Sequence, residues 1–196
     1  MIRLNSSRTL SSALWILLML CATAAAQEKI FPLDAKQTTV HFTLGSALHT
    51  VHGNFVLKLG SLRADPSTGA MSGEIIVDAR SGESGNGLRD RKMHREILES
   101  DKYPEIVFRP THMEGALADE GTSKVQVHGI FSLHGAAHEI TIPADVTLAP
   151  GRWTASLTFH IPYVKWGLKN PSTLFLRADE SVEIEVAAVG GYEQKQ

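Results

Sequence analysis

Nine histidines are the most conspicuous residues of this 196-residue sequence that could do chemistry. Neutral imidazoles at short spacing bind zinc and copper, and two pairs have such a spacing, His49-x-x-His52 and His134-x-x-x-His138. Both pairs are expected on strands or turns, where these spacings do not bring two rings to one face as i, i+4 does on a helix. A histidine-based metal-binding protein or metal-assisted enzyme therefore stays open as an alternative function, and most of the histidines are expected on strand surfaces and in turns.

The other polar residues lack a catalytic context. Glu96 and Glu99 would lie one turn apart on a short helix, and Asp90 sits between two arginines, as surface carboxylates commonly do. The glycines of residues 82–87 lack the lysine and the strand–turn–helix setting of a phosphate-binding loop, and no serine has a nucleophile-elbow context. We assign no catalytic residue, no metal ligand and no cofactor, and expect that the protein is not an enzyme.

The first 26 residues have the organisation of an export signal. Two arginines supply positive charge, residues 13–22 are apolar, and three alanines before Gln27 offer a cleavage site. Ten apolar residues are too few to cross a hydrocarbon core, which needs ~20. Residues 1–26 are predicted to be a cleavable signal peptide and the protein to be periplasmic or secreted. Cys21, the only cysteine, would be removed with it, so the mature chain would have no disulfide.

Charge argues against nucleic acid as a partner. The chain has 19 lysines and arginines and 21 acidic residues, so removing the two leader arginines leaves 17 against 21, a net charge of −4. A protein that binds nucleic acid through a basic surface would have the opposite balance.

Period-two alternation of apolar and polar residues dominates the rest of the chain, residues 27–196. This pattern is typical of strands with one apolar face. Turn residues at 65–69, 134–137 and 149–151 separate the strands, so neighbours should pair antiparallel. The predicted strands lie at 40–44, 55–59, 75–79, 125–133, 140–148, 153–161 and 182–188, with shorter candidates at 106–108 and 174–177.

One segment departs from the alternation. Residues 84–87 are prone to cap a helix, and from Leu88 the apolar residues take helical spacing until Tyr103-Pro104. We expect a short helix at one end of a β structure. Its four cations, Arg89, Arg91, Lys92 and Arg95, would meet an anionic head group or a membrane surface, or would form a solvated helix face.

Eight to nine strands with one apolar face each must pack as two sheets or close into a barrel. A membrane-spanning barrel is disfavoured, because the aromatic residues are scattered and do not form two girdles. A soluble barrel of this size is either filled by its own side chains or holds a narrow ligand. The alternation does not decide between these two, and by itself it favours a filled core.

Five segments in a fixed order resemble the YceI-like family. They are Val51–Phe55, Ser84–Asp90, Tyr103–Phe108, Val127–Gly135 and Ile161–Gly167, and the likeness extends from about Phe31 to Val189. The resemblance implies an all-β fold for residues 27–196, a single antiparallel, roughly eight-stranded lipocalin-like barrel with a short helix at one end. It further implies a long apolar pore that sequesters or carries a polyisoprenoid lipid, an isoprenoid quinone or a prenyl phosphate, in a periplasmic or secreted protein.

Two positions depart from the family pattern. Many relatives have an aromatic pair where this chain has Ile97-Leu98, and an Arg-x-Asp-Phe-Gly-like segment where it has residues 163–167. Both differences are expected to reshape the mouth of the pore. Besides the polyisoprenoid ligand, a transient contact with a membrane surface and a homodimer stay open as partners.

The expected ligand-binding residues are the apolar side chains that would face the pore, chosen by strand alternation and helical spacing. A slip of one residue in a strand would exchange its inward and outward sets. The predicted pore lining is Val40, Phe42, Leu44, Phe55, Leu57, Ile75, Val77, Leu88, Met93, Ile97, Leu98, Phe108, Val127, Phe131, Leu133, Ile140, Ile142, Leu157, Phe159, Tyr163 and Trp166.

Overall fold

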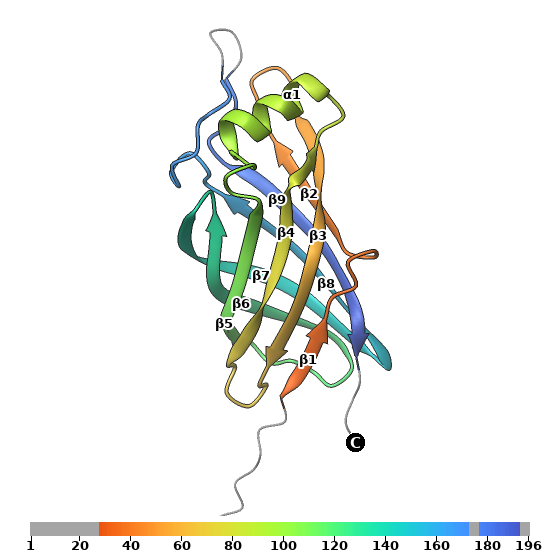
Figure 1. Ribbon diagram of the computed structural model, residues 1–196. Helices are drawn as coiled ribbons and strands as arrows, with labels where there is room; N and C mark the ends of the chain where they lie inside the picture. The colour runs from red at the N-terminus through yellow and green to blue at the C-terminus, as the bar shows by residue number, and fades with distance from the viewer. Residues whose placement is uncertain (1–27, 173–176, 193–196) are drawn as a thin grey trace, which may run out of the picture.

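Nine antiparallel strands and one short helical segment make up the described part of the chain, residues 28–172 and 177–192 of a computed structural model (Figure 1). The helical segment is α1 (Gly87–Lys92), continued by the π-helical turn η1 (Met93–Ile97). The strands are β1 (Lys29–Pro32), β2 (Thr39–Leu44), β3 (Val51–Ala64), β4 (Met71–Glu83), β5 (Glu105–Glu114), β6 (Gly121–Leu133), β7 (Ala136–Ala149), β8 (Gly151–Ile161) and β9 (Val182–Tyr192).

The sheet closes on itself through β3 and β4. The order around the ring is β3-β2-β9-β8-β7-β6-β5-β4, and β4 pairs back onto β3. The extra strand β1 pairs with residues 61–64 at one end of β3. Along the same edge of β3, residues 51–55 at the other end pair with β2. The predicted all-β barrel with a short helix at one end is confirmed. β1 itself was not predicted, because four residues are too few to show alternation.

Turn chemistry sets the register of the longest hairpin. His134 and Gly135 connect β6 to β7 with positive φ angles of 53° and 78°, the conformation of a two-residue type I′ turn. From the pair Leu133 and Ala136 the ladder then continues without interruption to Gly121 and Leu148. The predicted turns at 65–69 and 149–151 also connect neighbouring strands.

The helical segment lies across one end of the barrel, opposite β1 (Figure 1). Asn86 caps it, because the side-chain Oδ1 accepts hydrogen bonds from the backbone N–H groups of Leu88 and Arg89 at 3.1 and 3.2 Å. The predicted short helix is confirmed. Of the strand proposed at 174–177, residues 174–176 lie outside the described residues and Arg177 is not in a strand. The proposed signal peptide also lies outside them.

The inward face shifts along β3. Phe55 and Leu57 face the interior as predicted, and strict alternation placed Leu59 beside them. An irregularity in the pairing with β4 between Leu57 and Leu59 reverses the alternation, so that Leu59 is 46% exposed. Leu62 and Ala64 take over the inward face. This irregularity explains why Leu59 departs from the alternation of Phe55 and Leu57.

Strands β7 and β8 pair over only half of their length. Residues 144–149 of β7 pair with residues 152–157 of β8, while the first half of β7 has no ladder to β8 within the described chain. Trp166, just after β8, stacks there on His138 of β7, with ring centroids 4.1 Å apart and planes within 1°. The chain that follows β8 thus packs against the half of β7 that is not paired with β8.

Candidate functional site

An apolar cavity of about 600 Å³ occupies the interior of the barrel. This volume lies well within the range of about 300–1,000 Å³ that is typical of small-molecule sites. All nine strands contribute inward side chains to its wall. The apolar rows therefore enclose open space and do not meet one another in the middle.

Most of the residues predicted to line the pore contact this cavity. Their part in binding a ligand stays a prediction, since the position of a side chain does not by itself show contact with a ligand. The predicted residues in the wall are Val40, Phe42, Leu44, Phe55, Leu57, Ile75, Val77, Leu88, Met93, Ile97, Leu98, Phe108, Val127, Phe131, Leu133, Ile142, Leu157, Phe159 and Tyr163.

Ile140 and Trp166 were predicted in the wall but lie outside it. Ile140 is on the same face of β7 as Ile142, but in the half of the strand that is not paired with β8. Trp166 packs against this half through His138 and lies 5.8 Å from the ring of Phe131. Both residues pack against the buried cluster that includes Phe131, Ile142 and Phe159, without contacting the cavity.

Several wall residues were absent from the prediction. Some of them, such as Trp153, Ile161 and Ile184, lie in predicted strands and follow the same alternation as the predicted wall residues. The alternation of apolar and polar residues would therefore have identified them. Phe31 in β1 and Leu117 in the loop after β5 have no local pattern that indicates an inward position.

The β1 end of the cavity is closed by packed aromatic residues. The rings of Phe31 and Trp153 meet edge to face with centroids 5.5 Å apart, and both residues are buried. The indole Nε1 of Trp153 donates a hydrogen bond to the carbonyl oxygen of Pro32 at 3.0 Å. Leu148 and Ala64 are buried in the same cluster. This cluster closes the cavity, and the indole N–H of Trp153 within it is hydrogen-bonded.

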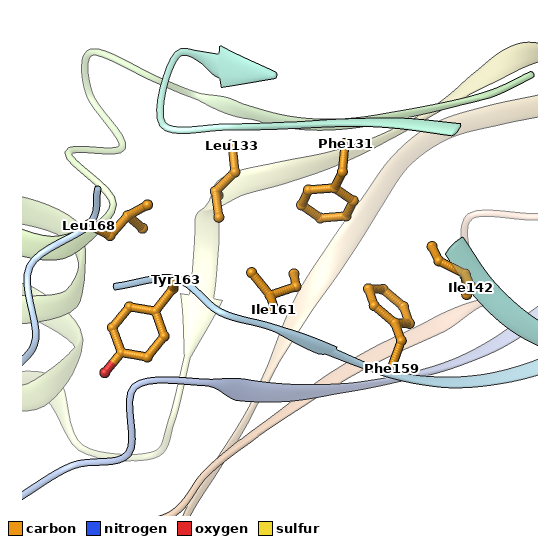
Figure 2. Packing of buried hydrophobic residues seen from close by; sticks show 7 residues of the cluster. All are labelled: Phe131, Leu133, Ile142, Phe159, Ile161, Tyr163 and Leu168. Carbon is orange, nitrogen blue, oxygen red and sulfur yellow. The ribbon is translucent and has the colours of Figure 1, made fainter. Parts of the chain in front are cut away.

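Further along the barrel, side chains from β6 and β8 face each other across the interior (Figure 2). Phe131 and Leu133 come from β6, and Phe159 and Ile161 from β8; the rings of Phe131 and Phe159 are 6.3 Å apart. Tyr163 and Leu168 continue this buried cluster towards the helical segment. All six side chains line the cavity.

The other end of the cavity is open beside α1. We call this end the mouth. It is formed by the cavity-lining residues that lie at this end, namely Ser46, His49, Ser84, Leu88, Arg89 and Lys92. Leu88 is 73% exposed although it lines the cavity, whereas Phe31 and Trp153 at the closed end are buried. A long, thin apolar molecule can therefore enter beside α1 and lie along the barrel.

The hydroxyl of Tyr163 is held in a buried position at this level of the barrel. It donates a hydrogen bond of 2.6 Å to the backbone carbonyl of Asp179. Burial, with a smaller contribution from the carboxylates of Asp179 and Glu180, raises the pKa of Tyr163 to about 12. The phenol is thus neutral over the whole physiological range.

This pKa predicts a loss of stability in strong base. The unfolded chain releases the tyrosine proton near pH 10 and the folded chain near pH 12, so the unfolded state binds fewer protons between these values. The free energy of unfolding should fall by about 1.4 kcal/mol per pH unit in this window. Urea unfolding from pH 9 to 12 measures the free energy of unfolding as a function of pH. Its decrease per pH unit should be larger in the wild type than in Tyr163→Phe; equal decreases would contradict the raised pKa of Tyr163.

The histidines do not come together as a metal site. His52 contacts Thr43 Oγ1 at 3.0 Å, His134 contacts Glu99 Oε2 at 2.8 Å, and His138 stacks on Trp166. Within residues 28–172 and 177–192 no three histidine, cysteine or acidic side chains are arranged to hold a metal ion. Each of these three histidines is engaged by a different neighbour.

Comparisons with known proteins agree with this geometry. The domain model of the YceI-like domain matches residues 31–189. No curated protein matches the chain significantly. In the described ranges, no helix has the length and apolar character needed to cross a bilayer.

Three solved structures share the fold at low identity. BcnA of Burkholderia cenocepacia is 17% identical with a TM-score of 0.67, over 81% of this chain and 99% of that one. A polyisoprenoid-binding domain from Saccharophagus degradans is 16% identical with a TM-score of 0.64, over 83% and 98%. The YCEI protein of Campylobacter jejuni is 21% identical with a TM-score of 0.56, over 76% and 88%.

Proposed function

Because the chain belongs to the YceI-like domain family, we propose that it is an exported protein that binds a polyisoprenoid lipid, an isoprenoid quinone or a prenyl phosphate, with the tail inside the barrel. The observation that carries the proposal is the apolar cavity, closed at the β1 end and open at the mouth. The polyisoprenoid-binding domain from Saccharophagus degradans, with its similar fold, supports the choice of tail.

A cavity of this kind is suited to carrying a lipid. A bilayer already solvates an isoprenoid tail, so the protein gains little free energy by taking it, and loading is readily reversed. The cavity wall offers apolar side chains in place of lipid chains. We infer that the protein sequesters or transports its ligand and does not transform it.

The mouth is also suited to a membrane surface. Leu48, in the loop between β2 and β3, and Leu88, on α1, are 76% and 73% exposed, and both lie at the mouth end of the barrel. Exposed apolar side chains beside cationic ones favour transient contact with a lipid interface. We infer that such contact, on the outer side of the membrane that the protein has crossed, lets a tail pass into the cavity.

The cavity volume predicts how many isoprene units contribute to affinity. At the ~30 Å³ that one water molecule occupies in the liquid, 600 Å³ has room for about 20 carbon-sized groups, on the order of four isoprene units. Affinity for prenols should rise at least about tenfold per unit from two to four units, because each buried methylene contributes ~0.8 kcal/mol, and should then level off.

Calorimetric titration with prenols of two to eight units, delivered from cyclodextrin, measures this dependence. Straight-chain diols of matched carbon number are the control, because their polar ends do not fit an apolar, closed cavity end. Prenols that bind no better as they lengthen, or no binding by any of them, would contradict the proposed function.

A further inference from the structure

The charges along the cavity have one sign. Among the described residues that line it, Arg89 and Lys92 are the only lysine or arginine side chains, and no aspartate or glutamate lines it. Both cations are half-buried on α1, where the apolar wall reaches solvent. The rest of the wall is apolar apart from Thr38, Ser46, His49 and Ser84, so the lysine and arginine side chains are concentrated at the mouth.

The partners of these two cations are not carboxylates. Six other lysines and arginines lie within 4.0 Å of a carboxylate, for example Lys58 with Glu105 and Arg109 with Glu74. Within the described ranges, neither Arg89 nor Lys92 has such a partner. The amine of Lys92 donates to the carbonyl oxygen of Pro171 at 3.1 Å. The two cations at the mouth therefore retain their charge without a carboxylate against them.

The nearest acidic residue along the chain is already engaged. Asp90 Oδ1 accepts hydrogen bonds from the backbone N–H of Ser84, at 3.0 Å, and from the Ser84 hydroxyl. Arg89 in turn donates from Nε to the Ser84 hydroxyl oxygen and from Nη2 to the Ser84 carbonyl oxygen, both at 2.7 Å. This network fixes the guanidinium at the rim, while the flexible Lys92 is held by one neutral acceptor only.

We propose that the mouth selects lipids with an anionic head group, a phosphate or a carboxylate, over lipids with the same tail and a neutral head. This inference rests on the proposed function and narrows its ligand class. A lipid whose tail lies along the cavity brings its head to Lys92 and Arg89. There an anion forms charge-assisted hydrogen bonds, which are roughly twice as strong as those of a neutral head. The amine of Lys92 exchanges the Pro171 carbonyl for the head group.

The test compares ligands that differ only in the head. Geranylgeranyl phosphate, geranylgeranoic acid and geranylgeraniol are titrated into the wild type, Lys92→Gln and Arg91→Gln. Arg91 is the matched control, because it is an exposed cation next to Lys92 that does not line the cavity. The wild type should bind the phosphate at least about tenfold more tightly than the alcohol, with the carboxylate between them.

The variants and the salt dependence identify the cause. Lys92→Gln should lose most of the preference for phosphate, because it weakens phosphate binding much more than alcohol binding, whereas Arg91→Gln should keep the preference. Raising salt from about 0.05 to about 0.5 M should weaken the two anionic ligands and leave the alcohol unchanged.

Two results would overturn the inference and leave the proposed function intact: equal affinity for phosphate and alcohol, or equal effects of the two substitutions. Inorganic phosphate that binds as tightly as the prenyl phosphate would also overturn it, since the mouth would then be a site for free anions. If none of the three lipids binds, the proposed function itself is wrong.

Discussion

Ala144→Trp should weaken prenol binding at least about 100-fold and leave the barrel folded. Ala144 lies on β7 with its side chain buried in the cavity wall, opposite neighbours on β6 and β8. An indole at this position would extend into open space and occupy the path of the tail. Because the space is vacant, the cost of overpacking, typically about 1–3 kcal/mol in a filled core, should be largely avoided.

Thermal melting and prenol titration of the same samples separate the two effects. The melting temperature should stay within about 5 °C of the wild type, since 1 kcal/mol corresponds to about 2–4 °C in a chain of this size. Ala187→Trp, on the exposed outer face of β9, is the matched control and should change neither measurement. A large loss of stability with binding retained would mean that the interior is filled.

Gly190→Ala should lower the free energy of unfolding by about 3–5 kcal/mol, the sum of overpacking and of a buried donor left without its acceptor. A Cβ atom on Gly190 would lie 1.8 Å from the carbonyl oxygen of Pro32 and 2.3 Å from Nε1 of Trp153. These two atoms form the hydrogen bond that closes the β1 end of the cavity. The methyl group therefore separates β1 from Trp153.

The neighbouring glycine is the control for this substitution. A Cβ atom on Gly191 would meet nothing within 4 Å, so Gly191→Ala should change stability by less than about 1 kcal/mol. Urea unfolding of both variants measures the difference. If the two substitutions have equal effects, the close packing between β1, Trp153 and β9 does not stabilise the barrel.

The sequence predicted the β6–β7 hairpin well because several signals coincide there. Val125, Val127 and Phe131 alternate with polar residues, and His134-Gly135 provides the turn that the observed register requires. Alternation also placed Val40, Phe42 and Ile142 correctly on the inner face, since each lies in a regularly paired stretch.

The incorrect predictions of wall residues have local structural causes that the alternation of apolar and polar residues does not indicate. The divergence of β7 from β8 moved Ile140 out of the wall. Trp166 lies in the chain after β8, where no strand pattern determines its direction.

Whether the barrel is hollow could not be predicted from the strands. Alternation says which side of a strand is apolar, and a filled barrel and a hollow one have the same alternation. The difference depends on how far apart the facing strands are held, and this follows from the closure of the whole ring. Only the family resemblance pointed to a pore, and no feature of the strand pattern measures its volume.

The incomplete pairing of β7 with β8 gives this seam of the barrel two halves of different stiffness. Where residues 144–149 of β7 pair with residues 152–157 of β8, an increase in girth must stretch backbone hydrogen bonds. Beside the first half of β7, it has only to displace the stacked rings of Trp166 and His138. A guest too bulky for the resting width therefore opens this seam first in its unpaired half, where the stiffness of one aromatic stack sets the resistance.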